Sequence, residues 1–127
     1  YGGVLHTAEL YAHGETQTML RWAVKYGTLV RVRRGLYCSP HLHHDVVRAL
    51  RAGGRLACVS ALAHLGLGPC PERLHVAVPA NTPRVVADEH VVVHWSRRAL
   101  GGDRVSVGEA AARRQAVRCR ALARDSL

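Results

Sequence analysis

The chain has 127 residues, of which 18 are Lys or Arg and 9 are Asp or Glu, so its formal net charge is +9. This length suits one domain or two very small ones, and the charge favours a polyanionic partner, with nucleic acid before an anionic membrane surface. No run of about 18 apolar residues and no signal peptide is recognisable, which argues against a membrane-spanning segment and favours a cytoplasmic protein.

The first predicted module covers residues 1–40 and begins with a short helix that Thr7 can cap. A second helix is expected over residues 16–26, with Thr16 as its N-cap and Gly27 as the glycine that stops it. Its apolar residues recur at helical spacing and are expected to face inward; they are Met19, Leu20, Ala23 and Val24.

A basic β-hairpin is predicted over residues 29–38, directly after this helix, with Arg33, Arg34 and Gly35 at its tip. Strand alternation sends Arg31 and Arg33 to one face and the neighbouring valines to the other. A helix that can enter a groove, followed at once by a cationic hairpin, is typical of a winged helix-turn-helix that binds duplex DNA. The candidate DNA-binding residues are therefore Thr16, Gln17, Thr18, Arg21, Lys25, Arg31, Arg33 and Arg34.

Both DNA-binding elements have a simpler alternative interpretation. The helix over residues 16–26 could be an ordinary amphipathic helix with a solvated polar face. The hairpin could be a charged edge strand whose arginines prevent aggregation. If the hairpin instead contacts DNA, its arginines lie on phosphates or enter the minor groove.

The second predicted module covers residues 41–127 and combines helices with a small antiparallel sheet. Asp45 is expected to cap a helix that reaches about residue 52. The other expected elements are a helix over residues 55–65, strands over 74–78, 84–87, 90–95 and 105–107, and a basic, alanine-rich helix over 108–124. The arginines of that last helix either form a second phosphate-binding surface or lie in water; they are Arg113, Arg114, Arg118, Arg120 and Arg124.

The cysteines and histidines form no recognisable metal-binding motif. None of the four cysteines (Cys38, Cys58, Cys70 and Cys119) forms a C-x-x-C pair, and the histidines that could join them are scattered. A zinc site is conceivable, but reduced thiols without a metal are expected. These histidines are His41, His43, His44, His64, His75, His90 and His94. No cofactor is predicted.

No catalytic motif is present either. The sequence lacks a nucleophile elbow, a phosphate-binding loop and a zincin motif. The only adjacent carboxylates, Asp88 and Glu89, fall in a predicted turn, and Ser60 is assigned a capping or packing role. We therefore expect that the chain is not an enzyme.

Three runs of sequence, over residues 3–10, 14–20 and 27–37, resemble the N-terminal winged-helix domain of AbiEi-type antitoxins from type IV toxin–antitoxin systems. Residues 59–67 and 74–79 resemble further blocks of the same family. The basic hairpin is the more specific part of this resemblance. The family usually has a helix before the position of Gly2 and Gly3, and here that first helix is absent.

The resemblance implies a cytoplasmic bacterial DNA-binding regulator that represses its own operon. It also implies a functional link to a nucleotidyltransferase-like toxin, without a stable complex. Some relatives carry a nuclease domain after these two modules, and none is expected here because the chain stops at Leu127. Operators with inverted repeats commonly recruit two copies, so the resemblance is compatible with a homodimer on DNA.

The sequence therefore predicts an α+β protein with an N-terminal winged helix-turn-helix over residues 1–40 and a small α+β module over 41–127. The predicted function is sequence-specific DNA binding by an autorepressing antitoxin, with double-stranded operator DNA as partner and no membrane. Two alternatives stay open. One is the DNA-targeting half of a nuclease-associated protein, and the other is an interaction module that neutralises a toxin by direct contact.

Overall fold

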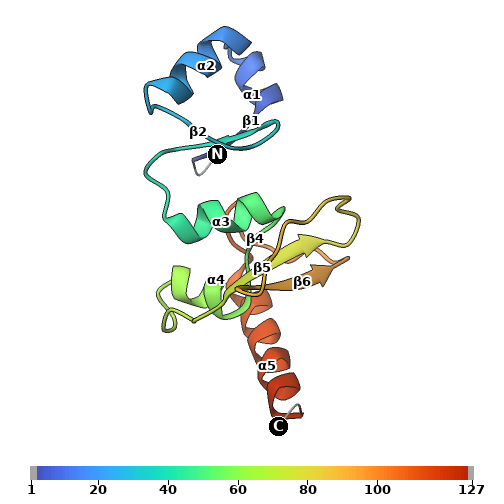
Figure 1. Cartoon of the computed structure of the whole chain (residues 1–127). Coiled ribbons are helices and arrows are strands. Elements are labelled where there is room, and N and C mark those ends of the chain that lie inside the picture. The colour runs from blue at the N-terminus through green and yellow to red at the C-terminus, as the bar shows by residue number, and fades with distance from the viewer. Residues whose placement is uncertain (1–2, 126–127) are drawn as a thin grey trace.

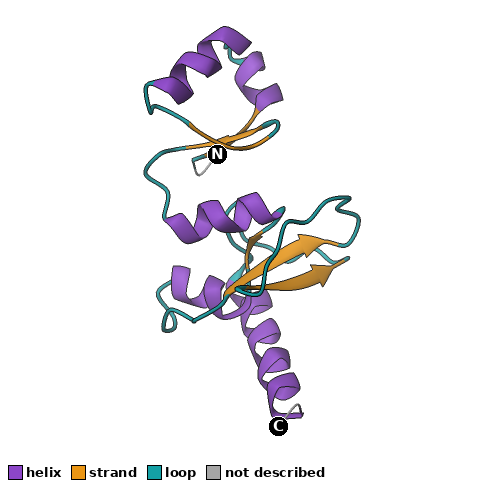
Figure 2. Ribbon diagram, viewed as in Figure 1, coloured by secondary structure: helices purple, strands orange, loops and turns teal. Residues whose placement is uncertain are grey.

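A computed structural model describes residues 3–125 of the chain, with side chains through residue 120. The fold is α+β, and its described part contains five helices and two three-stranded sheets. The first sheet lies with helices α1 and α2 at one end of the molecule, and the second sheet lies with helices α3, α4 and α5 at the other (Figures 1 and 2). The class predicted from the sequence is thus confirmed.

The N-terminal unit is an antiparallel sheet with strand order β1-β3-β2 and two helices. Its elements are β1 (Val4–His6), α1 (Thr7–Ala12), α2 (Gln17–Lys25), β2 (Val30–Arg33) and β3 (Leu36–Cys38). The Thr7 amide donates to the Gly35 carbonyl at 3.0 Å, so the start of α1 is attached to the hairpin tip. His6, rather than Thr7, occupies the N-cap position of α1.

Local signals set both ends of α2, as predicted. The Thr16 hydroxyl accepts a hydrogen bond from the Met19 amide at 3.2 Å, and Gly27 follows the helix with a φ of +77°. The predicted inward stripe is wrong in two positions, because Met19 is 47% exposed and Val24 is 38% exposed. Leu20 is the only buried residue of α2. The helix therefore packs along a narrow line and leaves most of its circumference open.

The hairpin agrees with the predicted alternation. Val32 is buried, whereas Arg31, Arg33 and Arg34 are exposed. An irregularity in the pairing between Arg31 and Arg33 lets the strand turn sharply at its tip, where Gly35 has a φ of +79°.

The C-terminal unit consists of helices around a mixed sheet with strand order β4-β5-β6. Its elements are α3 (His44–Ala52), β4 (Arg55–Leu56), α4 (Cys58–His64), β5 (Leu74–Pro79), β6 (Val91–Ser96) and α5 (Glu109–Asp125). Strand β4 is antiparallel to β5, but β6 runs parallel to β5. The prediction of a purely antiparallel sheet is therefore wrong.

Long-range backbone pairing explains two more corrections in this unit. The segment over residues 84–87 forms no strand, because the Val86 amide donates to the Ala52 carbonyl at the end of α3 (3.1 Å). The helix expected from residue 55 begins only at Cys58, because residues 55–56 pair with β5.

Two smaller expectations for this unit also need correction. Asp45 does not cap α3; the Nδ1 atom of His43 accepts from the Asp45 amide instead, at 3.1 Å. The strand expected over 105–107 is reduced to a single bridge between Ser106 and Leu56.

Buried side chains of both units form one continuous hydrophobic cluster, which runs from Val4 and Val32 to Ala116. Arg104 adds a polar link, because its guanidinium forms a two-point ion pair with Glu9 and donates to the Val4 carbonyl at 3.0 Å. The boundary near residue 40 stays a prediction, and the core does not break there.

Candidate functional site

The predicted DNA-binding residues of α2 all lie at the surface. Thr18, Arg21 and Lys25 are separated by three and four positions, which places them along one face of the helix. Thr16 and Gln17 stand at the N-terminal end of that helix, also exposed. The structure therefore presents these side chains to solvent, where a groove of DNA could receive them.

The same helix also exposes aromatic surface. The rings of Trp22 and Tyr26 are stacked, with centroids 5.4 Å apart and planes inclined by 8°. The Lys25 ammonium lies 5.0 Å from the centroid of the Trp22 ring, within cation–π range. Tyr26 is 72% exposed and Trp22 is 48% exposed, so the stacked pair presents aromatic surface to solvent.

The hairpin is anchored to the end of α2 by hydrogen bonds to a single carbonyl. The Ala23 oxygen accepts from the Thr28 amide at 2.9 Å, the Thr28 hydroxyl at 3.0 Å and the Leu29 amide at 3.2 Å. The chain therefore passes from the helix into β2 with a fixed direction. This anchor sets where Arg31 and Arg33 stand relative to α2.

The charge of this region has one sign. Residues 16–38 contain five basic side chains and no Asp or Glu; the basic ones are Arg21, Lys25, Arg31, Arg33 and Arg34. None of the five forms an ion pair in the part of the chain that the structure describes. A surface of this kind attracts phosphates over a distance of about one Debye length, roughly 8 Å at physiological salt.

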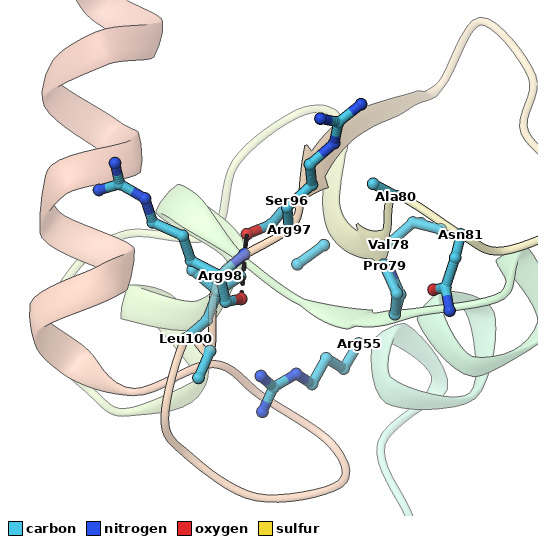
Figure 3. A pocket seen from close by; sticks show the side chains of 11 residues that line it. Arg55, Val78, Pro79, Ala80, Asn81, Ser96, Arg97, Arg98 and Leu100 are labelled. Carbon is cyan, nitrogen blue, oxygen red and sulfur yellow. Dashed lines mark hydrogen bonds between the residues drawn. The ribbon is translucent and has the colours of Figure 1, made fainter.

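A groove of about 590 Å³ lies elsewhere, at the carboxyl ends of the parallel strands β5 and β6 (Figure 3). It is lined by residues 77–81 and 96–100 together with Arg55, and this lining includes no carboxylate, thiol or imidazole. Arg55 is already engaged, because its Nη1 atom donates to the carbonyls of Gly101 (2.6 Å) and Asp103 (2.7 Å). Two further arginines, Arg97 and Arg98, also line the groove.

The C-terminal helix presents Arg113, Arg114, Arg118 and Arg120 at the surface. Arg113 pairs with Glu109 one turn earlier, at 2.9 Å. The predicted role of Arg124 concerns a side chain outside those described. The choice between a phosphate-binding and a merely solvated surface on α5 stays open.

A cluster of cysteine and histidine side chains lies inside the C-terminal unit, and the sequence did not predict it. Four side chains from four elements converge: Cys58 of α4, His75 of β5, His94 of β6 and Cys119 of α5. The strand register pairs His94 with Ala77, two positions after His75, so both imidazoles project from the same face of the sheet.

The four potential ligand atoms lie close together. His75 Nδ1 is 3.0 Å from His94 Nε2, and Cys119 Sγ is 3.6 Å from His94 Nε2 and 4.0 Å from His75 Nδ1. With Cys58 Sγ included, all four atoms lie within 4.8 Å of one another. We call these four residues the Cys₂His₂ cluster.

Burial controls the protonation of this cluster. Burial, with smaller contributions from His94 and Arg73, lowers the pKa of His75 to about 4, and burial also lowers the pKa of His94. Burial raises the pKa of the Cys58 thiol. At neutral pH both imidazoles and this thiol are therefore uncharged.

Sequence reasoning missed this cluster because its members are far apart in the chain and no two share an element. The one available signal was positional: His75 and His94 interrupt two otherwise apolar strands, LHVAV and VVVHW. A histidine at such a position has to find a polar partner or a ligand when the strand is covered.

No protein-family model matches this chain, and no curated protein matches it significantly. Over residues 3–125, the structure has no helix that is long and apolar enough to cross a bilayer.

Proposed function

We propose that this protein is a sequence-specific DNA-binding regulator whose N-terminal unit is a winged helix-turn-helix. In this proposal α2 is the recognition helix, and the hairpin of β2 and β3 is the wing. The observation that carries the proposal is the set of five exposed basic side chains on α2 and the hairpin, in a segment (residues 16–38) that contains no Asp or Glu, with the hairpin anchored to the helix end through the Ala23 carbonyl.

Each element has a distinct task on DNA. Thr16, Gln17 and Thr18 stand at the N-terminal end of α2, the part of a recognition helix that contacts base edges. Arg21 and Lys25 stand on the same face and suit phosphates, which fix register without reading sequence. The exposed arginines of the hairpin extend the phosphate contacts beyond the major groove.

Within this function we propose autorepression as an AbiEi-like antitoxin as the biological role. The resemblance of residues 3–37 to that family supports it, and the exposed basic surface is compatible with it. The expected DNA is then the region upstream of the protein's own gene. Repression of a reporter gene driven by that region tests the role, and binding without repression contradicts it.

A second candidate is a protein-interaction module that neutralises a toxin by contact. The observation in its favour is the apolar surface on the two N-terminal helices, where Tyr11, Trp22 and Tyr26 are exposed. Tyr11 lies on α1 and is not one of the residues assigned to DNA. A Tyr11→Ser variant that loses toxin neutralisation and keeps promoter affinity favours this candidate.

Fluorescence anisotropy on the upstream fragment, measured over a series of salt concentrations, tests the DNA-binding proposal. If Arg33 contacts one phosphate, Arg33→Ala makes the negative slope of log K against log salt shallower by about 0.9. Arg84→Ala is the matched control, because it removes the same charge from an exposed loop of the other unit. An Arg33→Ala slope equal to that of the wild type refutes the wing contact.

The recognition helix needs its own test. Arg21→Glu is expected to abolish specific binding and leave the circular dichroism spectrum unchanged, because Arg21 is exposed and has no ion-pair partner among the described residues. Footprinting then locates the operator. Equal affinity for the upstream fragment and for a scrambled duplex contradicts sequence-specific recognition.

A further inference from the structure

We propose that Cys58, His75, His94 and Cys119 form a structural zinc site in the C-terminal unit. This inference is independent of the proposed DNA binding, since all four residues lie outside the N-terminal unit. The ligand set of two thiolates and two imidazoles is one that zinc takes in closed, four-coordinate structural sites. Such a set favours zinc over magnesium or calcium, which prefer oxygen ligands.

The geometry of the cluster fits a tetrahedral ion. With Zn–N bonds of about 2.0–2.1 Å and Zn–S bonds of about 2.3 Å, neighbouring ligand atoms of a tetrahedron lie roughly 3.3–3.8 Å apart. The three distances between His75, His94 and Cys119 are 3.0, 3.6 and 4.0 Å, and they bracket that range. Small side-chain adjustments therefore suffice to close the site around one ion.

Hydrogen bonds to the backbone of His75 and Cys58 fix the positions of these two residues in the structure. The His75 amide donates to the Ser60 hydroxyl at 2.9 Å, and the His75 carbonyl accepts from the Ala57 amide at 3.0 Å. The Cys58 amide donates to Gln115 Oε1 at 2.9 Å, and Gln115 stands one turn before Cys119 on α5. The neighbours of the ligands thus connect α4, β5 and α5 in the arrangement that the ion requires.

The backbone at Cys58 also departs from the ordinary helical range. Its φ is +53°, and it is the only residue other than glycine with a positive φ in the part of the chain that the structure describes. A non-glycine residue adopts this region only when its surroundings hold it there. Here the conformation belongs to the first residue of α4, whose thiol joins the cluster.

An opening reaches the cluster from solvent. A groove of about 490 Å³ runs between β6 and α5, and its lining includes both His94 and Cys119. Zinc can enter by this path, and each thiol that binds it releases its proton to water. Bound zinc then joins helices α4 and α5, which pack against each other, to the parallel strands β5 and β6 (Figure 1).

The test uses the full chain, reduced and freed of metal, then loaded with one equivalent of zinc chloride and desalted. Elemental analysis is expected to give about one zinc per chain. Cys119→Ser is expected to weaken zinc binding by more than about 100-fold, because loss of a ligand exceeds the 10–100-fold effect of losing a ligand's neighbour. Cys70→Ser, which removes an exposed thiol outside the cluster, is the matched control and keeps full stoichiometry.

Cobalt loading of the wild type keeps the proposal testable if the Cys119→Ser variant does not fold. A four-coordinate site with thiolate ligands gives the visible bands of tetrahedral cobalt and a near-ultraviolet sulfur-to-cobalt charge-transfer band. Wild-type protein that retains no zinc above the buffer blank, or that gives an octahedral cobalt spectrum without the charge-transfer band, overturns the proposal. Equal zinc retention by wild type and folded Cys119→Ser overturns it as well.

Discussion

Replacement of Ser60 by alanine tests how α4 is attached to the sheet. The Ser60 side chain is only 6% exposed, and its hydroxyl accepts from the His75 amide of β5 at 2.9 Å. The sequence left a capping and a packing role open for Ser60; in the structure Ala57 is the N-cap of α4, and the Ser60 hydroxyl joins α4 to β5. Alanine removes the acceptor and leaves the His75 amide of β5 without this partner in a part-buried position.

The magnitude follows from the loss of this part-buried hydrogen bond. An unsatisfied buried donor costs about 1–3 kcal/mol, so Ser60→Ala is expected to lower the free energy of unfolding by that amount. At roughly 4 °C per kcal/mol for a chain of this size, the melting temperature falls by about 4–12 °C.

Chemical denaturation of wild type and variant in parallel provides the assay, with the slope against denaturant used to check two-state behaviour. Ser96→Ala is the control, because that hydroxyl also accepts one backbone hydrogen bond, from the Arg98 amide at 3.1 Å, but at the solvent-exposed end of β6. Water replaces it there, and the control is expected to change stability by less than about 0.5 kcal/mol. The Ser96 hydroxyl also donates to the Arg98 carbonyl at 3.2 Å, so the control removes at least as many hydrogen bonds as Ser60→Ala does, and equal effects of the two substitutions refute the reasoning.

Three further predictions concern the rest of the fold. The ion pair with Arg104 and a hydrogen bond from the His6 amide lower the pKa of Glu9 from 4.5 to about 2. The stabilisation that the Glu9 carboxylate provides is therefore complete above about pH 4.5 and is lost as the pH falls through about 2. Glu9→Gln should make the melting temperature less dependent on pH in that window. Gly54→Ala places a Cβ atom 2.0 Å from the Ala77 carbonyl oxygen and is expected to lower the free energy of unfolding in urea by about 3 kcal/mol or more. Gly66→Ala is the control: its Cβ atom meets open space, and only its φ of +77° is unfavourable, so the expected loss is about 1 kcal/mol. Free zinc at about 100 times its dissociation constant should raise the free energy of unfolding by about 2.7 kcal/mol, and an unchanged melting temperature in zinc contradicts the metal site.

The sequence by itself determined the elements whose signals are local. Thr16 and Gly27 bound α2 because a capping hydroxyl and a left-handed glycine act within one helical turn. The hairpin with its exposed arginines followed from the alternation of residues 30–33 and the glycine at the tip. These features depend on residues a few positions apart, so composition and spacing suffice to predict them.

Tertiary structure alone decided the features that join distant segments. The direction of β6 depends on the path of residues 80–90 past the end of α3, which no local pattern records. The ion pair of Arg104 with Glu9 and the meeting of Cys58 with Cys119 arise only after the helices have packed on the sheet. Side chains more than fifty positions apart have no periodicity in common, and packing of the whole chain sets the distance between them.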